Sequence, residues 1–157
     1  MPFYAGARIS EVVALDVDDV RMSRRIGELR LYGKGGKVRT VPLKPQLRTA
    51  LAAWIEQRSA WPGAGGPALF LNHTGGRLSA TAASDIITAI TATARLEDPP
   101  TAQVFRHTFG TTLVRADTDL ATVAELLGHS RIETVRIYSR PTEADKIRAL
   151  EHLTVDE

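Results

Sequence analysis

The sequence predicts an α+β fold that is mainly α, in which a small antiparallel β-sheet near the N-terminus packs on a bundle of helices. Polar and apolar residues alternate over 28–32 and 38–43, on either side of a glycine-rich turn, and this pattern is typical of a β-hairpin. From residue 101 onward, apolar residues recur at helical spacing in short segments. At 157 residues the chain is long enough to bury a sizeable core, so we expect a single domain.

The first 43 residues are predicted to form a short helix followed by the hairpin. Apolar residues at helical spacing indicate a helix over 8–15, which ends in the acidic turn 16–19. Because charge runs are usually solvated, we expect this turn at the surface. The two strands of the hairpin, 28–32 and 38–43, are joined by the glycine turn 33–36.

The middle of the chain is predicted to contain two longer helices separated by loops. A helix over 45–60 begins with a proline, which suits a first helical turn, and packs on the hairpin. A Pro/Gly loop at 61–67, an extended segment at 68–71 and a turn at 74–77 follow. The second helix is expected over 79–95, with one apolar face formed by Ile86, Ile87 and Ile90.

The last third of the chain is predicted to be helical in short pieces, over 102–116, 119–127, 131–138 and 143–152. The buried stripe of the first piece recurs every four residues, at Phe105, Phe109 and Leu113. Gly128 stands where a helix C-cap needs positive φ, and Ser130 with Glu133 forms a capping box for the next helix. His129 is therefore expected between two helix ends.

The composition is that of an ordinary globular protein, with 43% hydrophobic and 24% charged residues and a net charge of +2. Arginine outnumbers lysine sixteen to four, and the planar guanidinium matches phosphate in a bidentate way. The sequence contains no cysteine, which excludes disulfides, thiolate chemistry and cysteine-type zinc sites. It shows neither an apolar run of roughly 18 residues nor a signal-peptide pattern, so we expect a cytoplasmic protein with no membrane partner.

Five side chains have the chemistry needed to break a phosphodiester through a covalent intermediate: Arg8, Lys34, Arg106, His129 and Tyr138. Such a reaction needs a nucleophile, cations for the pentacoordinate charge and an acid for the leaving hydroxyl. A phenol is a poor nucleophile at neutral pH, so phosphate-bound cations must help to activate it. The acidic residues are scattered rather than clustered as Mg²⁺ ligands would be, so we expect no metal and no other cofactor.

Several segments, taken in their order along the chain, resemble the tyrosine recombinase (phage integrase) family, in particular its Xer-like bacterial members. The matching segments are GARISEVVALDVDDV, LYGKGGKVRTVPL and QVFRHTFGTTLVRADTDLATVAELLGHSRIETVRIY, followed by a short helix. They cover nearly the whole chain in the order and spacing of the family. The resemblance implies the catalytic-domain fold and site-specific DNA recombination without a metal.

The resemblance also implies a role for each of the five side chains. Arg8 and Arg106 are similar to the two family arginines that clamp the scissile phosphate, and His129 to the histidine that hydrogen-bonds it. Lys34 resembles the lysine that protonates the departing 5′ oxygen, although Lys37 lies in the same turn and its amine could also reach the phosphate; we prefer Lys34. Tyr138 resembles the nucleophile that forms a 3′-phosphotyrosyl link.

One position supports this site and another departs from the family pattern. Glu11 lies one helical turn after Arg8, a spacing that lets it orient the arginine. Gln103 stands where the family most often has histidine, and it can donate a hydrogen bond but cannot become a cation. We expect a deficit of about 1.5 to 3 kcal/mol, roughly tenfold to hundredfold in rate. His107 is about 100° around the helix from Arg106 and does not simply replace the missing histidine.

Further contacts with double-stranded DNA are expected from a wider set of basic residues: Lys37, Arg39, His73, Arg77, His107, Arg136 and Arg140. The resemblance implies a tetrameric synapse on DNA, with self-association through the C-terminal helix 143–153, and a location at the bacterial nucleoid. Only seven residues precede Arg8, so we treat 1–157 as a single catalytic domain and expect the N-terminal DNA-binding domain and first catalytic-domain helix of the family to be absent or truncated.

Two other functions fit parts of the same sequence. A non-catalytic, sequence-specific DNA-binding protein would use the helix-turn-helix-like segment 120–140, and Gln103 favours such a binding-only descendant. A type IB topoisomerase-like activity would share the chemistry and relax DNA without synapsis. The KGG hairpin is hard to explain in a regulator, so the enzyme remains the preferred hypothesis.

Overall fold

The computed structural model describes residues 1–23, 25–94, 98–129 and 138. Its sheet consists of β1 (Val20–Met22), β2 (Gly27–Tyr32) and β3 (Val38–Pro42). The α-helices are α1 (Pro2–Ala5), α2 (Ile9–Ala14), α3 (Pro45–Arg58), α4 (Ala80–Thr93), α5 (Ala102–Arg115) and α6 (Leu120–Leu127), with short 3₁₀ turns at η1 (Val17–Asp19) and η2 (Lys34–Gly36). This is the predicted α+β architecture, mainly α.

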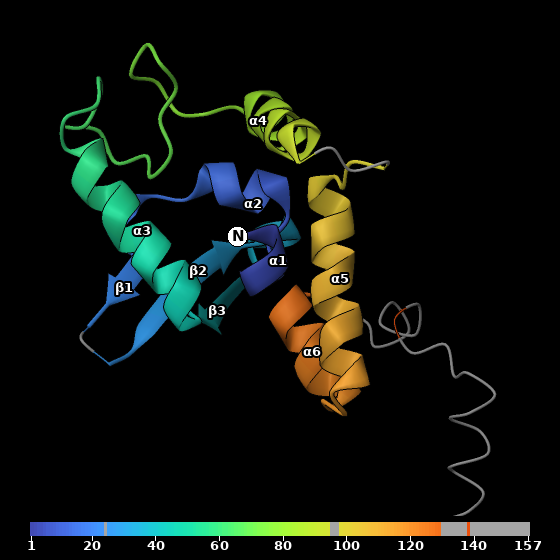
Figure 1. The fold of residues 1–157 in the computed structure, drawn as a ribbon. Helices are drawn as coiled ribbons and strands as arrows, with labels where there is room; N and C mark the ends of the chain where they lie inside the picture. Colours follow the sequence, from blue (N-terminus) through green and yellow to red (C-terminus); the bar gives the residue numbers. More distant parts are fainter. Residues whose placement is uncertain (24, 95–97, 130–137, 139–157) are drawn as a thin grey trace, which may run out of the picture.

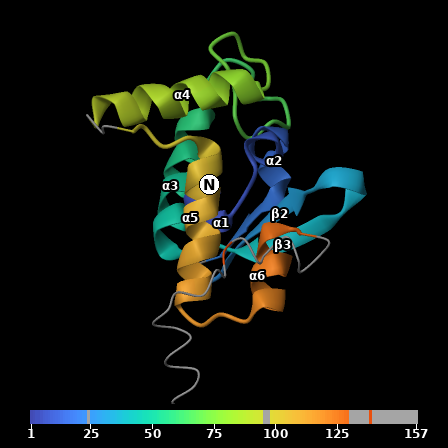
Figure 2. The same cartoon turned by 90° about the vertical axis from the view of Figure 1, so that its right-hand side faces the viewer.

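The helices surround a small sheet (Figure 1). Helix α3 packs on the sheet through Leu47 and Leu51, which belong to the same core cluster as Leu29 and Leu31. Helices α5 and α6 lie side by side, α6 touches β3, and α1 lies against α5. Helix α4 touches α2 and lies across the end at which α5 begins (Figure 2). The start of α2, the start of α5 and the end of α6 therefore come close together.

The sheet is antiparallel, in the order β1-β2-β3. The predicted hairpin is confirmed, with Leu29 opposite Val41 and Tyr32 opposite Val38. The side chains alternate as a half-buried sheet requires, so that Leu29 and Leu31 are fully buried while Glu28 is exposed. Strand β1 was not predicted, because three residues are too few to show an alternating pattern and only pairing with β2 defines them as a strand.

Two hydrophobic clusters hold the fold together. The larger one joins the sheet, α2 and α3; its fully buried large side chains are Leu15, Leu29, Leu31 and Leu69. The smaller one joins α5 and α6, through Phe109, Val123, Ala124 and Leu127. Leu126 packs against both clusters, so α6 links the sheet to α5.

The structure shows how far two predicted helix faces are buried. The apolar face of α4 is largely open: Ile90 is 63% exposed and Ile86 is also exposed, whereas Ala83 and Thr91 are the buried residues of this helix. Helical spacing shows that side chains share a face, and only tertiary contacts decide whether another element covers it. On α5 the predicted stripe is partly confirmed, because Phe109 is buried and Phe105 and Leu113 are half-buried.

The acidic turn after α2 is less solvated than predicted. Asp19 is buried, and its carboxylate accepts the Asp16 backbone N–H at 3.0 Å and the Tyr32 hydroxyl at 3.0 Å. These bonds tie the turn to β2. In the described part of the chain, no helix combines the length and apolarity needed to cross a bilayer, and no three acidic or histidine side chains are grouped to hold a metal ion.

The predicted C-cap at Gly128 is confirmed, since its φ is 64° and its ψ is 40°. Asp119 begins the same helix, accepting the Thr122 backbone N–H at 3.0 Å. The predicted helices after Gly128 and the capping box of Ser130 with Glu133 lie outside the described residues, apart from Tyr138.

Candidate active site

The residues singled out in the sequence meet at an open cleft of about 780 Å³. Its walls come from the N-cap of α2, the first turns of α5, the residue after the α6 cap and Tyr138. Six of the predicted site residues line it: Arg8, Gln103, Arg106, His107, His129 and Tyr138. Segments that are a hundred residues apart in the sequence thus form one surface.

Arg8 is held at the edge of the cleft by Glu11. The Glu11 carboxylate accepts the Arg8 backbone N–H at 2.8 Å and its Nη1–H at 2.9 Å, so the predicted contact between the two residues is present. Glu11 is 4% exposed, whereas the Arg8 side chain is 42% exposed. The guanidinium is therefore fixed at its base and still open toward the cleft.

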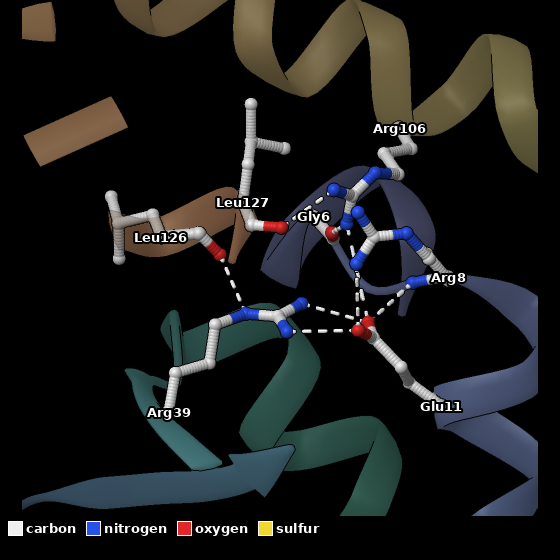
Figure 3. A network of polar contacts seen from close by, with 7 residues as sticks. All are labelled: Gly6, Arg8, Glu11, Arg39, Arg106, Leu126 and Leu127. Carbon is white, nitrogen blue, oxygen red and sulfur yellow. Dashed lines mark hydrogen bonds and ion pairs between the residues drawn. The ribbon is translucent and has the colours of Figure 1, made fainter. Parts of the chain in front are cut away.

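Arg39 occupies the opposite side of the same carboxylate (Figure 3). Its Nη1 and Nη2 donate to the two oxygens of Glu11 at 2.9 and 2.8 Å, and its Nε donates to the Leu126 carbonyl at 2.9 Å. Burial alone would raise the pKa of Glu11, but the hydrogen bonds from Arg39 and Arg8 bring it below its usual value. The expected contact of Arg39 with DNA stays a prediction; its side chain is 9% exposed and lines a neighbouring cleft together with Lys34 and Lys37.

Arg106 lies on α5 at the back of the cleft. Its guanidinium donates to the Gly6 carbonyl and to the Leu127 carbonyl, the latter at 2.6 Å, and lies 4.0 Å from the Glu11 carboxylate. Burial, with a further contribution from nearby Arg8, lowers the pKa of Arg106 to about 10, so it is still a cation at neutral pH. Three arginines therefore surround one carboxylate beside the cleft, and two of them, Arg8 and Arg106, line it; this excess of positive charge is suited to an anion.

His129 follows the α6 cap and faces the cleft. Its backbone N–H donates to the Ala124 carbonyl at 2.9 Å, which fixes the turn. Its Nδ1 is buried and has no hydrogen-bond partner among the described residues. Burial, followed by the charges of Arg106, Arg8 and Arg39, lowers the pKa of His129 to about 4, so the imidazole is neutral at pH 7.

Tyr138 packs between two histidines. The centre of its ring is 4.9 Å from the ring of His107 and 6.3 Å from the ring of His129. A Cβ at Gly110 would come within 3.0 Å of the Tyr138 ring, so glycine leaves room for the phenol. Gly110 was not predicted as a site residue, because the need for glycine in a helix becomes evident only when the side chain that packs against it is known.

The two hairpin lysines line a second cleft next to the first one. A neighbouring cleft of about 410 Å³ is lined by Lys34 and Lys37 and shares Arg8 and His129 with the first one. Both lysines are exposed. The choice between them therefore stays a prediction.

Of the remaining predicted DNA contacts, His73 and Arg77 belong to the described residues, and neither lines the cleft. His73 is exposed in the turn beyond Leu71. Arg77 donates to the carbonyls of Val13 and Leu15 and pairs with Asp16, which gives it a structural role at the end of α2. The other two, Arg136 and Arg140, lie outside the described residues.

Known proteins resemble this chain in sequence and in fold. The model of the Phage integrase family matches residues 2–145. Tyrosine recombinase XerC of Roseiflexus castenholzii is 38% identical over 141 residues, which are 87% of this chain and 44% of that protein. Tyrosine recombinase XerD of Mycobacterium leprae is 38% identical over 146 residues, 89% of this chain and 46% of that protein. The chain spans about half the length of these relatives.

A solved structure has the same fold. The XerH site-specific recombinase, bound to its difH substrate in a pre-cleavage complex, superposes with a TM-score of 0.82 at 27% identity. The match covers 99% of this chain and 45% of that one. The correspondence thus extends over all of the elements that build the cleft.

Proposed function

This chain belongs to the phage integrase family, and we propose that it is a tyrosine-type site-specific recombinase that cleaves and rejoins double-stranded DNA through Tyr138. The observation that supports the proposal most directly is the convergence of Arg8, Arg106, His129 and Tyr138 on one cleft. The relatives named above carry the names of tyrosine recombinases, and the XerH structure holds a DNA substrate. A phosphodiester is the anion that such a cleft would take.

In the proposed reaction the Tyr138 hydroxyl oxygen attacks the scissile phosphorus. A P–O bond to tyrosine forms, the bond to the 5′ oxygen breaks, and the phenolic proton of Tyr138 passes to a solvent water in the open cleft. The product is a 3′-phosphotyrosyl link and a free 5′ hydroxyl, whose proton comes from Lys34 or Lys37. Since the phosphoester bond is exchanged rather than hydrolysed, a new 5′ hydroxyl can reverse the step and rejoin a strand.

The arginines would stabilise the charge that builds up in the transition state. Arg8 is open toward the cleft, and Arg106 is a buried cation held by two carbonyls, so neither must reorganise much when the phosphate binds. His129 is neutral at pH 7 and carries a single ring N–H, which would donate to a non-bridging oxygen. Gln103 would add a neutral donor at the place where the family usually has histidine.

The test is a nicked suicide duplex mixed with the full chain and analysed on a denaturing gel. We expect a covalent protein–DNA adduct that Tyr138→Phe abolishes. Salt-sensitive binding without any adduct would instead indicate a DNA-binding protein that does not cleave. Relaxation of supercoiled DNA without recombination of two sites would assign the topoisomerase-like alternative.

The general acid can be identified with a substrate in which sulfur replaces the 5′ bridging oxygen. A thiolate leaves without protonation, so this substrate bypasses the need for a proton donor. We propose Lys34 as the donor, and expect Lys34→Ala to cleave normal DNA slowly and the sulfur substrate at the wild-type rate. The matched variant Lys37→Ala should cleave both at rates close to wild type; the reverse pattern would assign the role to Lys37.

The assembly on DNA is part of the same proposal. We expect a tetrameric synapse at the bacterial nucleoid, with the C-terminal segment 143–153, which lies outside the described residues, docked on a neighbouring subunit. Deletion of the residues after Ser139 should then impair synapsis in a gel-shift assay with two DNA sites. Unchanged synapsis and cleavage after this deletion would contradict the docking role.

A further inference from the structure

Arg39 connects three parts of the site that are distant in sequence. Its fork of donors holds both oxygens of Glu11, 28 residues away, and its Nε holds the Leu126 carbonyl, 87 residues away. Figure 3 shows the guanidinium lying between the α2 carboxylate and the end of α6. We propose that Arg39 is a positioning residue, which holds Glu11 and the end of α6 together so that Arg8 and His129 face one phosphate; this rests on the proposed function.

The first consequence of this contact concerns the charge of Glu11. The carboxylate is almost fully buried and lies 2.9 Å from Arg8 and 4.0 Å from Arg106. Without Arg39, a buried carboxylate would have only these two cations as partners, and it would draw them away from the cleft. Arg39 satisfies both oxygens of Glu11 in a bidentate way and leaves the charge of the other arginines available to an anion.

The second consequence concerns the turn that carries His129. A Cβ at Gly128 would lie 2.6 Å from Nη1 of Arg39, so the guanidinium rests directly against the backbone of this turn. Glycine is therefore required at residue 128 both for its φ of 64° and for the approach of Arg39. Loss of Arg39 would leave the Leu126 carbonyl without this donor and the turn without its support.

A direct contact of Arg39 with DNA would predict a different behaviour. Nε, Nη1 and Nη2 of Arg39 each donate to a protein acceptor, and Arg39, unlike Arg106, does not line the cleft that contains Tyr138. A phosphate-contacting arginine would weaken DNA binding and reduce its salt dependence when removed. Removal of a positioning residue would slow cleavage at saturating DNA and leave the affinity for DNA almost unchanged.

The experiment compares Arg39→Ala and Arg39→Lys with wild type in single-turnover cleavage of the nicked duplex at saturating protein. We expect the cleavage rate of Arg39→Ala to fall about 10- to 100-fold, because a misplaced Arg8 and His129 no longer match the phosphate. Lysine keeps the charge without the fork and should restore little of the rate. The dissociation constant for DNA should hardly change.

The matched control is Arg58→Ala, since Arg58 is another buried arginine that donates to carbonyls but lies outside both clefts that Arg8 lines. It should lower the thermal stability without slowing cleavage by the folded protein. If Arg58→Ala lost the same amount of cleavage rate, general destabilisation would explain the effect of Arg39→Ala. Weaker DNA binding with an unchanged saturated rate would make Arg39 a DNA contact; either result overturns the proposal.

Amide hydrogen exchange separates this inference from the proposed function. The His129 N–H, which is bonded to the Ala124 carbonyl, should exchange faster in Arg39→Ala than in wild type and not in Arg58→Ala. If wild type forms no adduct with DNA, the proposed function fails, but faster exchange would still support the positioning role. Unchanged exchange together with an unchanged cleavage rate would contradict it.

Discussion

Arg58 and the three arginines beside the cleft are satisfied in opposite ways. Arg58, at the end of α3, donates to the carbonyls of Ala64, Gly66 and Ala68 and has no carboxylate partner among the described residues. Around the cleft, three arginines share one carboxylate, Glu11. Arg58 is enclosed by its own loop, whereas Arg8 is 42% exposed toward open space.

The two cases differ in whether the positive charge holds the fold together or is available to a bound anion. The carbonyls around Arg58 use its donors to hold the Pro/Gly loop, so its charge serves the fold. At the cleft, one carboxylate cannot neutralise three guanidinium groups, and the excess must be balanced by solvent ions or by a bound anion. Burial of an arginine alone therefore does not indicate a site; the balance of charges around it does.

Arg8→Ala should have the largest effect on the reaction. We expect single-turnover cleavage to slow by about 100- to 1000-fold, because a donor that stabilises transition-state charge is lost. The fold should persist, since Glu11 keeps its bidentate contact with Arg39. A circular dichroism melting curve would verify the fold, and a rate close to wild type would contradict the assignment of Arg8 to the phosphate.

Arg58→Ala should instead reduce stability. We expect the free energy of unfolding to fall by about 2–4 kcal/mol, because several loop carbonyls lose a charged donor at once. Urea denaturation would measure the change. If this variant also lost cleavage while still folded, the assignment of Arg58 to the fold alone would be wrong.

Gln103→His should raise the rate of DNA cleavage. Gln103 is exposed in the first turn of α5 and lines the cleft, so an imidazole should fit there without disturbing the core. A charge-assisted donor is worth about 1.5 to 3 kcal/mol, so we expect a gain of roughly 10- to 100-fold in cleavage rate. Gln103→Ala is the matched control and should show no gain; a histidine without effect would mean that residue 103 does not reach the phosphate.

The smallest expected effect is a dependence of stability on pH through His129. Its pKa is lowered from 6.5 to about 4 in the folded protein, so the unfolded chain takes up this proton first as the pH falls. The free energy of unfolding should therefore decrease between pH 6.5 and 4. Urea denaturation across this range should show a shallower decrease for His129→Gln, and equal slopes would contradict the lowered pKa.

Local features were predicted correctly from the sequence because their causes lie within a few residues. The hairpin follows from alternation on either side of the glycine turn, and the C-cap follows from the need for positive φ at Gly128. The contact between Glu11 and Arg8 follows from their spacing of three residues. The family resemblance added the expectation that distant motifs form one site.

Other features were missed because their causes lie far apart in the chain. Arg39 was predicted as a DNA contact, and its partners Glu11 and Leu126 were not predicted, because nothing near it in the sequence indicates them. Ile90 shares a helix face with Ile86, as predicted, but its spacing did not show that this face is exposed. Strand β1 exists through its pairing with β2.

Residue type and local spacing set which chemical groups this protein can bring to a phosphate, because they fix charge, caps and turns. Which arginine faces the cleft and which one supports it depends on how distant segments pack together. Arg8, Arg39 and Arg58 are chemically identical, and each takes its role from the acceptors that the packed helices and sheet place around it.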